Sequence, residues 1–331
     1  KKIAVYLDEN GYLFALKKII HQYPHCWRCK TPILFRATDQ WFCSVEDFKD
    51  KACEAIDSVK WIPAWGHDRI TNMVKERKDW CISRQRKWGV PIPIFFCKEC
   101  GEAHIDNDAM MAVADLFEKE GSNAWYSHTA AEILPEGTKC KKCGCTEFEK
   151  EKDIMDVWFD SGSSHAAVVS KRDNLKFPAD LYLEGNDQYR GWFQSSLLTS
   201  VATEGVAPYK AGLTHGMILD EEKRKMSKSL GNGISPQDVT EKYGADVLRL
   251  WVSSTDYQSD VHISNEILKQ ISESYRKIRN TARYILGNVY DFNPDTDSVP
   301  VNELMPMDKW AIVKLNELIA KVKQAYDNYE F

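Results

Sequence analysis

The chain has 331 residues, 43% of them hydrophobic and 28% charged, which is enough to bury a large core and predicts two domains with room for a small third. Its 44 basic and 49 acidic residues give a net charge of −5, which excludes a basic field over the whole surface and restricts nucleic-acid contacts to local patches. No stretch approaches the ~20 apolar residues of a membrane span, and residues 1–10 lack the apolar run of a signal peptide. These features indicate a cytoplasmic protein with no membrane contact.

The first part of the chain predicts a strand pair followed by two helices. Residues 3–7 and 12–16 flank the turn sequence DENG at 8–11, a pattern typical of two paired strands. Residues 45–56 and 67–78 carry apolar side chains at helical spacing, so each segment is expected to form a helix.

The cysteines are grouped as CxxC pairs, which in a cytosolic chain of this size indicates a metal site rather than disulfides. Cys97 and Cys100 form one pair, and Cys140 and Cys143 form another. Four thiolates bind Zn²⁺ tetrahedrally and leave no position open for catalysis. We therefore predict a structural zinc site in a small insertion, with Cys145 as an alternative to Cys140 or Cys143.

The rest of the chain alternates short apolar strands with helices, which is the pattern of a βαβ sheet, and it ends in long amphipathic segments. The expected strands are 155–159, 181–183 and 213–219. The expected helices are 108–120, 187–203, one that begins at Ser235-Pro236, 265–290 and 307–329. The last two are separated by a turn-rich stretch and predict the start of a helical bundle.

The most informative motif is the KMSKS run at 225–229, which follows Lys223 and Arg224. A loop of this kind presents ammonium and hydroxyl groups that neutralise a triphosphate while phosphorus is attacked. A lone Lys-rich run is more often a solvated basic loop, so the interpretation depends on the other motifs of the chain.

Four further segments, together with KMSKS and in the same order, resemble the class I aminoacyl-tRNA synthetases. They are WCISRQRKWGVPIP at 80–93, DVWFDSG at 156–162, LEGNDQYRGWF at 183–193 and HG at 215–216. The wording DVWFDSGS and GWFQSS is similar to the isoleucyl branch, and the valyl and leucyl branches are the alternatives. Asn186 and Tyr189 depart from the Ser and His found in many relatives.

The resemblance implies an α/β protein that contains the C-terminal half of a Rossmann-like catalytic domain. The implied parts are a return segment from an editing insertion at 1–45, the catalytic domain at 46–96 and 151–262, a zinc-binding insertion at 97–150, and the start of a helical anticodon-binding domain at 263–331. The His-Ile-Gly-His signature of the first catalytic half does not occur in the sequence. The chain alone is therefore expected to be inactive and to belong to a longer protein.

Residue by residue, the resemblance implies a site for the aminoacyl-adenylate. Glu184, Gly185 and Asp187 would hold its ribose and backbone, and Gln188 would meet the substrate ammonium. A carboxylate accepts two ribose hydroxyls, a glycine allows close approach, and an amide oxygen accepts from an ammonium. Acidic residues at a helix N-terminus are the alternative explanation for the two carboxylates.

The remaining implied roles concern the amino acid, the base and the phosphates. Trp158, at an expected strand end, and Trp192, in the following helix, would line the isoleucine pocket, although buried indoles are more often plain core. The segment His215, Gly216 and Met217 would face adenine. Lys225 and Lys228 would be the catalytic cations that act on the phosphates.

The resemblance also bears on the first CxxC pair. Cys26 and Cys29 are similar to half of a second zinc site, whose partner pair in the family lies upstream of Lys1. The site would be incomplete unless His21, His25 or Cys43 takes part.

The implied activity is ATP-dependent activation of isoleucine to isoleucyl-adenylate, followed by transfer to tRNA(Ile). The implied partners are ATP, L-isoleucine and tRNA(Ile), with structural Zn²⁺ and with Mg²⁺ accompanying ATP, and the expected state is a monomer. A zinc-stapled tRNA-binding module without catalysis is an alternative. Another KMSKS nucleotidylyltransferase is disfavoured by the zinc insertion and the long C-terminal helices.

Overall fold

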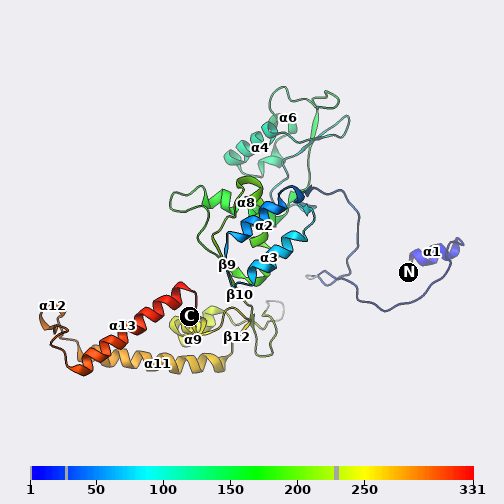
Figure 1. Ribbon diagram of the computed structural model, residues 1–331. Coiled ribbons are helices and arrows are strands. Elements are labelled where there is room, and N and C mark those ends of the chain that lie inside the picture. The colour runs from blue at the N-terminus through cyan, green and yellow to red at the C-terminus, as the bar shows by residue number, and fades with distance from the viewer. Residues whose placement is uncertain (1, 27–28, 227–230) are drawn as a thin grey trace. The chain divides into compact units, whose positions relative to one another are not determined.

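The computed structural model describes residues 2–26, 29–226 and 231–331 (Figure 1). The chain divides into two compact units, Lys1–Trp41 and Phe42–Phe331. Within the described ranges, no helix combines the length and the apolar character needed to cross a membrane.

The first unit contains a helix where the sequence predicts a strand pair, so that prediction is wrong. Helix α1 spans Lys2–Glu9, and 12–16 forms no strand. Gly11 has a φ of 72°, and the N–H of Tyr12 bonds to the carbonyl of Leu7 at 2.8 Å. Asn and Gly end helices in this way as readily as they form hairpin turns, and here they end a helix. No described residue of this unit is buried.

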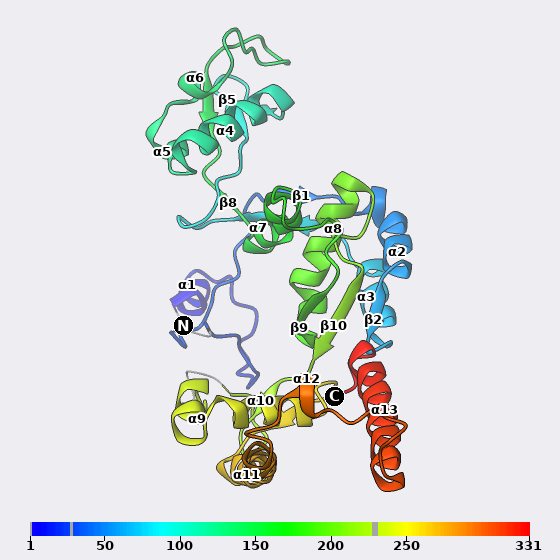
Figure 2. The same ribbon diagram turned by 90° about the vertical axis from the view of Figure 1, so that its left-hand side faces the viewer.

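The second unit is organised around a parallel sheet in the order β2-β10-β9 (Figure 2). The strands are β2 (Lys60–Ile62), β9 (Tyr182–Gly185) and β10 (Ala211–His215). The helices of this region are α2 (Lys49–Asp57), α3 (Gly66–Lys75), α7 (Val157–Gly162) and α8 (Trp192–Glu204). Side chains of α2, α3 and α8 share one core with the strands, among them the fully buried Ile56, Ile70 and Leu197. The predicted helices at 45–56 and 67–78 are confirmed, as is the strand at 181–183.

Two strands and a helix of the prediction are interrupted, each at an identifiable residue. Strand β8 (Ile154–Met155) ends before Asp156, which caps α7, so 157–159 is helical. The segment 213–219 divides at Gly216 into β10 and β11 (Ile218–Leu219). The segment 187–203 divides at Gly191 into a 3₁₀ helix η3 (Asn186–Arg190) and α8.

Short elements join these parts. The two-stranded pairs are β1 (Phe42–Cys43) with β3 (Trp80–Cys81), β4 (Ser83–Arg84) with β8, and β11 with β12 (Val261–His262). The first two pairs are antiparallel and the third is parallel. A 3₁₀ turn η1 (Glu46–Phe48) precedes α2, and a π-helical turn η2 (His165–Val169) follows α7.

The cysteine-rich segment has its own sheet and core. Its antiparallel sheet has the order β6-β5-β7, and the elements are β5 (Phe95–Cys97), β6 (Ala103–His104), β7 (Phe148–Lys150), α4 (Asn107–Glu120), α5 (Ala124–Ser127) and α6 (Ala130–Ile133). Phe95 and Trp125 are almost fully buried, with ring centroids 5.1 Å apart. The predicted helix at 108–120 is confirmed as α4.

The C-terminal part is helical. Its elements are α9 (Pro236–Tyr243), α10 (Ala245–Ser254), α11 (Asn265–Asn288), α12 (Pro294–Asp297) and α13 (Pro306–Asp327). The side chain of Ser235 accepts a hydrogen bond from the N–H of Asp238, which confirms the predicted N-cap. Trp251 and Leu268 are buried in a small core, whereas α13 buries none of its residues.

Candidate active site and cysteine cluster

The residues expected to hold an adenylate lie at the carboxyl ends of two neighbouring parallel strands. β9 ends at Gly185 and β10 at His215, and these two residues are register partners. Glu184, one residue earlier, is exposed and is the partner of the buried Thr214. Ligands of open parallel sheets bind beyond this edge. The fold therefore brings the two predicted segments together at the edge where a ligand is expected.

The space around Gly185 shows how closely these segments approach. A Cβ at Gly185 would lie 2.8 Å from Oδ1 of Asp187, 3.4 Å from Cε of Met217 and 3.7 Å from Cε1 of His215. Asp187 and Glu184 are both exposed, so their carboxylate oxygens are available to accept hydroxyl groups.

Tyr189, which departs from the family pattern, links the turn after β9 to strand β10. Its side chain is fully buried, and its hydroxyl lies 3.0 Å from Oγ1 of Thr214 on β10. Its ring contacts Trp61 and Phe193 at centroid distances of 5.9 and 5.8 Å. The η3 turn that carries Asp187 is thereby attached to the central strand.

Gly216 is explained by packing within the chain. A Cβ there would lie 2.2 Å from the backbone oxygen of Ser259, a distance that no side chain can occupy. The N–H of Gly216 donates to Tyr257 O at 2.8 Å, and that of Met217 to Oδ1 of Asp260 at 2.7 Å. The carbonyl of Gly216 lies 2.7 Å from Nδ1 of His215, and that of Met217 accepts the N–H of Val261 at 2.9 Å. Both N–H groups are therefore already bonded, and only the second acceptor position of each carbonyl is left to read a base.

Gln188 and Trp158 converge over Gly191. A Cβ at Gly191 would lie 2.5 Å from Oε1 of Gln188 and 3.0 Å from the Trp158 ring. Oε1 of Gln188 accepts the N–H of Trp192 at 2.9 Å, which uses one of the two acceptor positions of the amide oxygen. Trp158 is 41% exposed and lies in the first turn of α7, not at a strand end as predicted.

Trp192 is held in a fixed orientation. Its ring stacks on that of Tyr182 with centroids 4.1 Å apart and an interplanar angle of 8°. Its indole N–H donates to Ser161 O at 3.0 Å and to Oγ of Ser164 at 3.2 Å. One face of this indole is therefore occupied by the protein, and only the remaining surface can contact a ligand.

Asp156, for which the sequence predicted no role, lies in the DVWFDSG motif and binds several donors. It is 4% exposed and forms an ion pair with Arg84 at 2.9 Å. It also accepts the indole N–H of Trp80 at 3.2 Å and the backbone N–H of Trp158 at 3.3 Å. An Asp between a strand and a helix is the N-cap signal that could have identified it. Asp156 thus connects the SRQ segment to the helix that carries Trp158.

A cavity of about 320 Å³ lies beside this carboxylate and is lined by Arg77, Arg84 and Arg190, among others. Nη1 of Arg77 donates to Oε1 of Gln194, and its guanidinium lies 5.2 Å from the centroid of Trp80. Burial lowers the pKa of Arg77.

The KMSKS loop is described only in part. Lys225 is exposed, while Ser227, Lys228, Ser229 and Leu230 lie outside the described residues, so the structure does not place the predicted catalytic Lys228. The segments on both sides of them meet at the buried Asp220. This carboxylate accepts from Nδ2 of Asn232 at 2.7 Å and pairs with Arg224 at 2.9 Å. The pKa of Asp220 is lowered to about 2, mainly by the hydrogen bond from the Asn232 amide and further by the hydrogen bonds and charge of Arg224.

The four predicted cysteines Cys97, Cys100, Cys140 and Cys143 form one cluster. Their sulfur atoms all lie within 4.8 Å of one another, with 3.4 Å between Cys97 and Cys143 and 3.6 Å between Cys100 and Cys140. Four sulfurs around Zn²⁺ at 2.3 Å would be separated by about 3.8 Å, so the cluster has the size needed to hold a metal. Cys145 is not in this cluster, and its sulfur accepts the N–H of Glu147 at 3.3 Å instead.

The two CxxC turns have the same backbone geometry. In each turn the glycine after the second cysteine has positive φ, 69° at Gly101 and 77° at Gly144, and its N–H bonds to the first cysteine's carbonyl at 2.9 Å. The N–H of Cys100 is the main cause that lowers the pKa of Cys97, to about 6, and that of Cys143 lowers the pKa of Cys140. Each turn therefore favours the thiolate, the form that binds metal, at its first cysteine.

Cys26 and Cys29 belong to a third turn of similar form. The N–H of Cys26 bonds to Thr31 O at 2.8 Å, that of Lys30 to Cys26 O at 2.9 Å, and Lys30 has a φ of 60°. The hydroxyl of Thr31, 2.9 Å from the sulfur, lowers the pKa of Cys29 to about 7. Among the described residues of the first unit, Cys26 and Cys29 form no cluster of potential metal ligands with His21 or His25.

A family model described as tRNA synthetases class I (I, L, M and V) matches residues 5–264. The chain therefore belongs to this family of class I tRNA synthetases.

Within the family, the chain is 61% identical over all 331 residues to the isoleucine--tRNA ligase of Caldicellulosiruptor bescii. It is 64% identical, over 98% of its length, to that of Caldanaerobacter subterraneus subsp. tengcongensis. The chain spans 36% and 35% of the lengths of these two relatives.

A solved structure supports the fold assignment. The methionyl-tRNA synthetase of Mycobacterium tuberculosis, bound by methionyl-adenylate, matches with a TM-score of 0.62 and 18% identity. The match covers 94% of this chain and 52% of that one. The chain thus has the mixed α/β catalytic-domain fold of class I synthetases, as the resemblance predicted.

Proposed function

We propose that this chain is part of an isoleucine--tRNA ligase, which activates isoleucine with ATP and transfers it to tRNA(Ile). The observation that carries the proposal is the meeting of β9 and β10 at one carboxyl edge, with Asp187, His215 and Met217 gathered around Gly185. The identity to isoleucine ligases favours isoleucine over the valine and leucine alternatives.

At this edge, the exposed carboxylates of Glu184 and Asp187 would accept the ribose hydroxyls of the adenylate, as the resemblance implies. Gln188 would meet the substrate ammonium, because one acceptor position of its amide oxygen remains after the bond to Trp192. Trp158 and the free surface of Trp192 would enclose the branched side chain. His215 to Met217 would face the adenine.

The phosphates of ATP would be met by the KMSKS loop. Lys225 is exposed, its carbonyl accepts a hydrogen bond from the Asn232 amide that also binds Asp220, and Lys228 follows it in the sequence. Ammonium groups at this position stabilise the charge that shifts to the departing pyrophosphate, an effect often worth several kcal/mol. Mg²⁺ bound with ATP would supply further neutralisation of the phosphates.

We assign Zn²⁺ to the cluster of Cys97, Cys100, Cys140 and Cys143, in a structural role. Support comes from the four converging sulfurs and from the matching turns that favour the thiolate at Cys97 and Cys140. Cys26 and Cys29 have the same kind of turn and would serve as half of a second site.

The segments 97–150 and 263–331 would be the zinc-binding insertion and the start of the anticodon-binding helices. The separate core of the first and the long helices α11 and α13 of the second are consistent with these roles. A monomeric, cytoplasmic enzyme remains the expectation from the sequence.

The proposal is tested with the complete protein that contains this segment, by ATP-pyrophosphate exchange with isoleucine, valine and leucine. Isoleucine should be preferred, and valine should be the better of the two competitors, because one methylene is worth only ~1–3 kcal/mol of discrimination. A preference for leucine or valine, or no dependence on an amino acid, would refute the assignment.

A further inference from the structure

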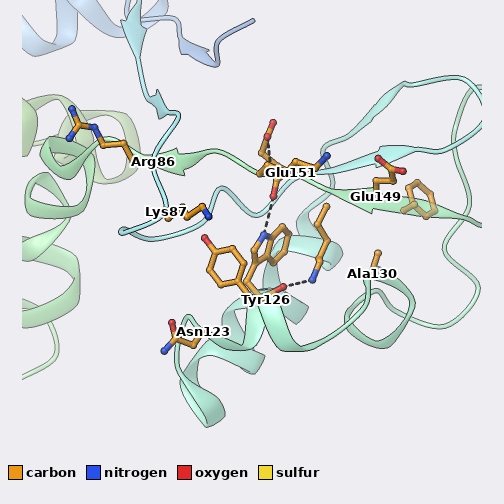
Figure 3. A pocket seen from close by; sticks show the side chains of 11 residues that line it. Arg86, Lys87, Asn123, Tyr126, Ala130, Glu149 and Glu151 are labelled. Atoms are coloured by element: carbon orange, nitrogen blue, oxygen red, sulfur yellow. Dashed lines mark hydrogen bonds between the residues drawn. The ribbon is translucent and has the colours of Figure 1, made fainter. Parts of the chain in front are cut away.

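A second cavity, of about 810 Å³, lies where the cysteine-rich segment meets the loop after β4. Figure 3 shows Lys87, on that loop, and Tyr126, on α5, reaching into the same space from two different elements. The strand β7 and the residues after it, up to Lys152, complete the wall. No role assigned above uses this cavity.

The lining is basic although the whole chain is acidic. It contains four cationic residues, Arg86, Lys87, Lys150 and Lys152, against the two acids Glu149 and Glu151. Lys150 stabilises the fold, because its ammonium donates to the carbonyls of Trp125 and His128. The other three cations are exposed and available to an anionic ligand.

Exposed aromatic rings accompany these cations. Tyr126 is 56% exposed at the cavity, and Trp88, the neighbour of Lys87 in the sequence, is 95% exposed. Aromatic rings beside Lys and Arg are the usual means of binding single-stranded nucleic acid, because bases stack on the rings while phosphates meet the cations. A duplex offers no free base faces to such a site, so an unpaired strand is the better fit.

The loop that lines the cavity is also linked to the expected amino acid site by an ion pair and a helix cap. Arg84, two residues before Arg86, forms the ion pair with Asp156, and Asp156 caps the helix that carries Trp158. A strand bound at Arg86 and Lys87 would therefore lie on the segment that supports the expected isoleucine pocket.

We propose that this cavity binds the unpaired 3′ end of the tRNA, with a base stacked on Tyr126 and phosphates at Lys87, Arg86 and Lys152. The inference rests on the proposed function and deepens it, because it gives the cysteine-rich segment a part in positioning the substrate strand.

The test uses the complete ligase and measures the KM for tRNA in aminoacylation alongside isoleucine-dependent pyrophosphate exchange. Tyr126→Ala should raise the tRNA KM about tenfold through lost stacking, and Tyr126→Phe should restore it. Lys87→Gln should raise it several-fold and reduce the slope of log KM against log salt by about 0.7, the loss of one single-strand phosphate contact. The matched control Lys119→Gln, on α4 and outside the cavity, should change neither quantity.

The pyrophosphate-exchange measurement distinguishes failure of the cavity assignment from failure of the proposed function. Normal exchange with an unchanged tRNA KM in both Tyr126→Ala and Lys87→Gln would overturn the cavity assignment and leave the proposed function intact. Absence of isoleucine-dependent exchange in the unsubstituted ligase would instead overturn the proposed function.

A photocrosslinking experiment provides a second test, which does not depend on the tRNA KM of the Ala and Gln variants. With p-benzoylphenylalanine at position 126 of the complete ligase, cross-links to the 3′-terminal nucleotides of added tRNA are expected. Cross-links only within the polypeptide would show that another segment of the protein fills the cavity, and would overturn the inference.

Discussion

At the scale of single residues, two buried carboxylates hold together segments that carry expected site residues. Asp156 binds Arg84 and Trp80 and caps α7, while Asp220 binds Arg224 and Asn232 on either side of the KMSKS run. A buried carboxylate with several donors is stable only while those donors remain in place, so each acts as a clamp on its neighbourhood.

The clamp at Asp220 can be tested by Asp220→Asn, which keeps the shape of the side chain but removes its charge. Amide hydrogen exchange should accelerate at 221–226 and 231–233, because Arg224 and Asn232 lose a charged acceptor. Asp180→Asn, which removes an exposed ion pair with Lys210, is the control and should change exchange little.

The pH dependence of that clamp has a definite sign. The folded pKa of Asp220, about 2, is below the ordinary carboxyl value of about 3.9. Its stabilisation is therefore complete above about pH 4 and is lost as the pH falls toward 2. The exchange difference between the wild type and Asp220→Asn should shrink over that interval, and a difference that instead grows there would contradict the clamp.

The pocket assignment is tested at Trp158, which is 41% exposed. In the complete ligase, Trp158→Ala should raise the isoleucine KM about tenfold, because the ligand loses apolar burial worth ~25 cal/mol per Å². The ATP KM should change little. Trp192→Phe, which retains a ring to stack on Tyr182, should have a smaller effect. A raised ATP KM with an unchanged isoleucine KM would move Trp158 out of the pocket.

At the scale of elements, the sequence predicted what periodicity and capping determine. The helices α2, α3, α4, α11 and α13 lie where the sequence predicts them, and α9 begins at the predicted Ser235 N-cap. The predictions were wrong where the same residues are found in two kinds of local structure. Asn10-Gly11 ends a helix although it could form a hairpin, and Asp156 starts a helix inside an apolar run that resembles a strand.

For the candidate site too, the sequence identified residues with a local signal and missed those that depend on distant partners. The sequence identified Glu184, Asp187 and His215 through a motif, and the parallel register of β9 and β10 then brought them together. It gave no role to Asp156 or Asp220, because Trp80 lies 76 residues from Asp156 and Asn232 lies 12 residues from Asp220 in the sequence. Long-range hydrogen bonds of this kind leave no periodic signal.

The assignment of zinc to the cysteine cluster can be tested through the stability of the segment 97–150. In the complete ligase, Cys97→Ser combined with Cys143→Ser should remove one bound zinc per chain and loosen α4, since metal and folding are coupled in small metal-bound segments. Cys145→Ser is the matched control and should retain the zinc, because its sulfur lies outside the cluster. Metal analysis that found zinc lost in Cys145→Ser but kept in the double variant would contradict the assigned ligands.

At the scale of the whole molecule, the chain accounts for about a third of the length of its relatives. The helices α11 and α13 expose large apolar residues, among them Ile285, Trp310 and Leu318. Catalysis is therefore expected of the complete protein that contains this segment.

We propose that the carboxyl edge of β9 and β10 holds the aminoacyl-adenylate. The most direct measurement is calorimetric binding of a non-hydrolysable isoleucyl-adenylate analogue to the complete ligase and to its Glu184→Gln and Asp187→Asn variants. Each variant should bind at least about tenfold more weakly, because hydrogen bonds to charged groups are worth ~1.5–3 kcal/mol. The control Glu204→Gln, exposed at the end of α8, should bind like the wild type. Wild-type affinity in both edge variants would contradict the claim.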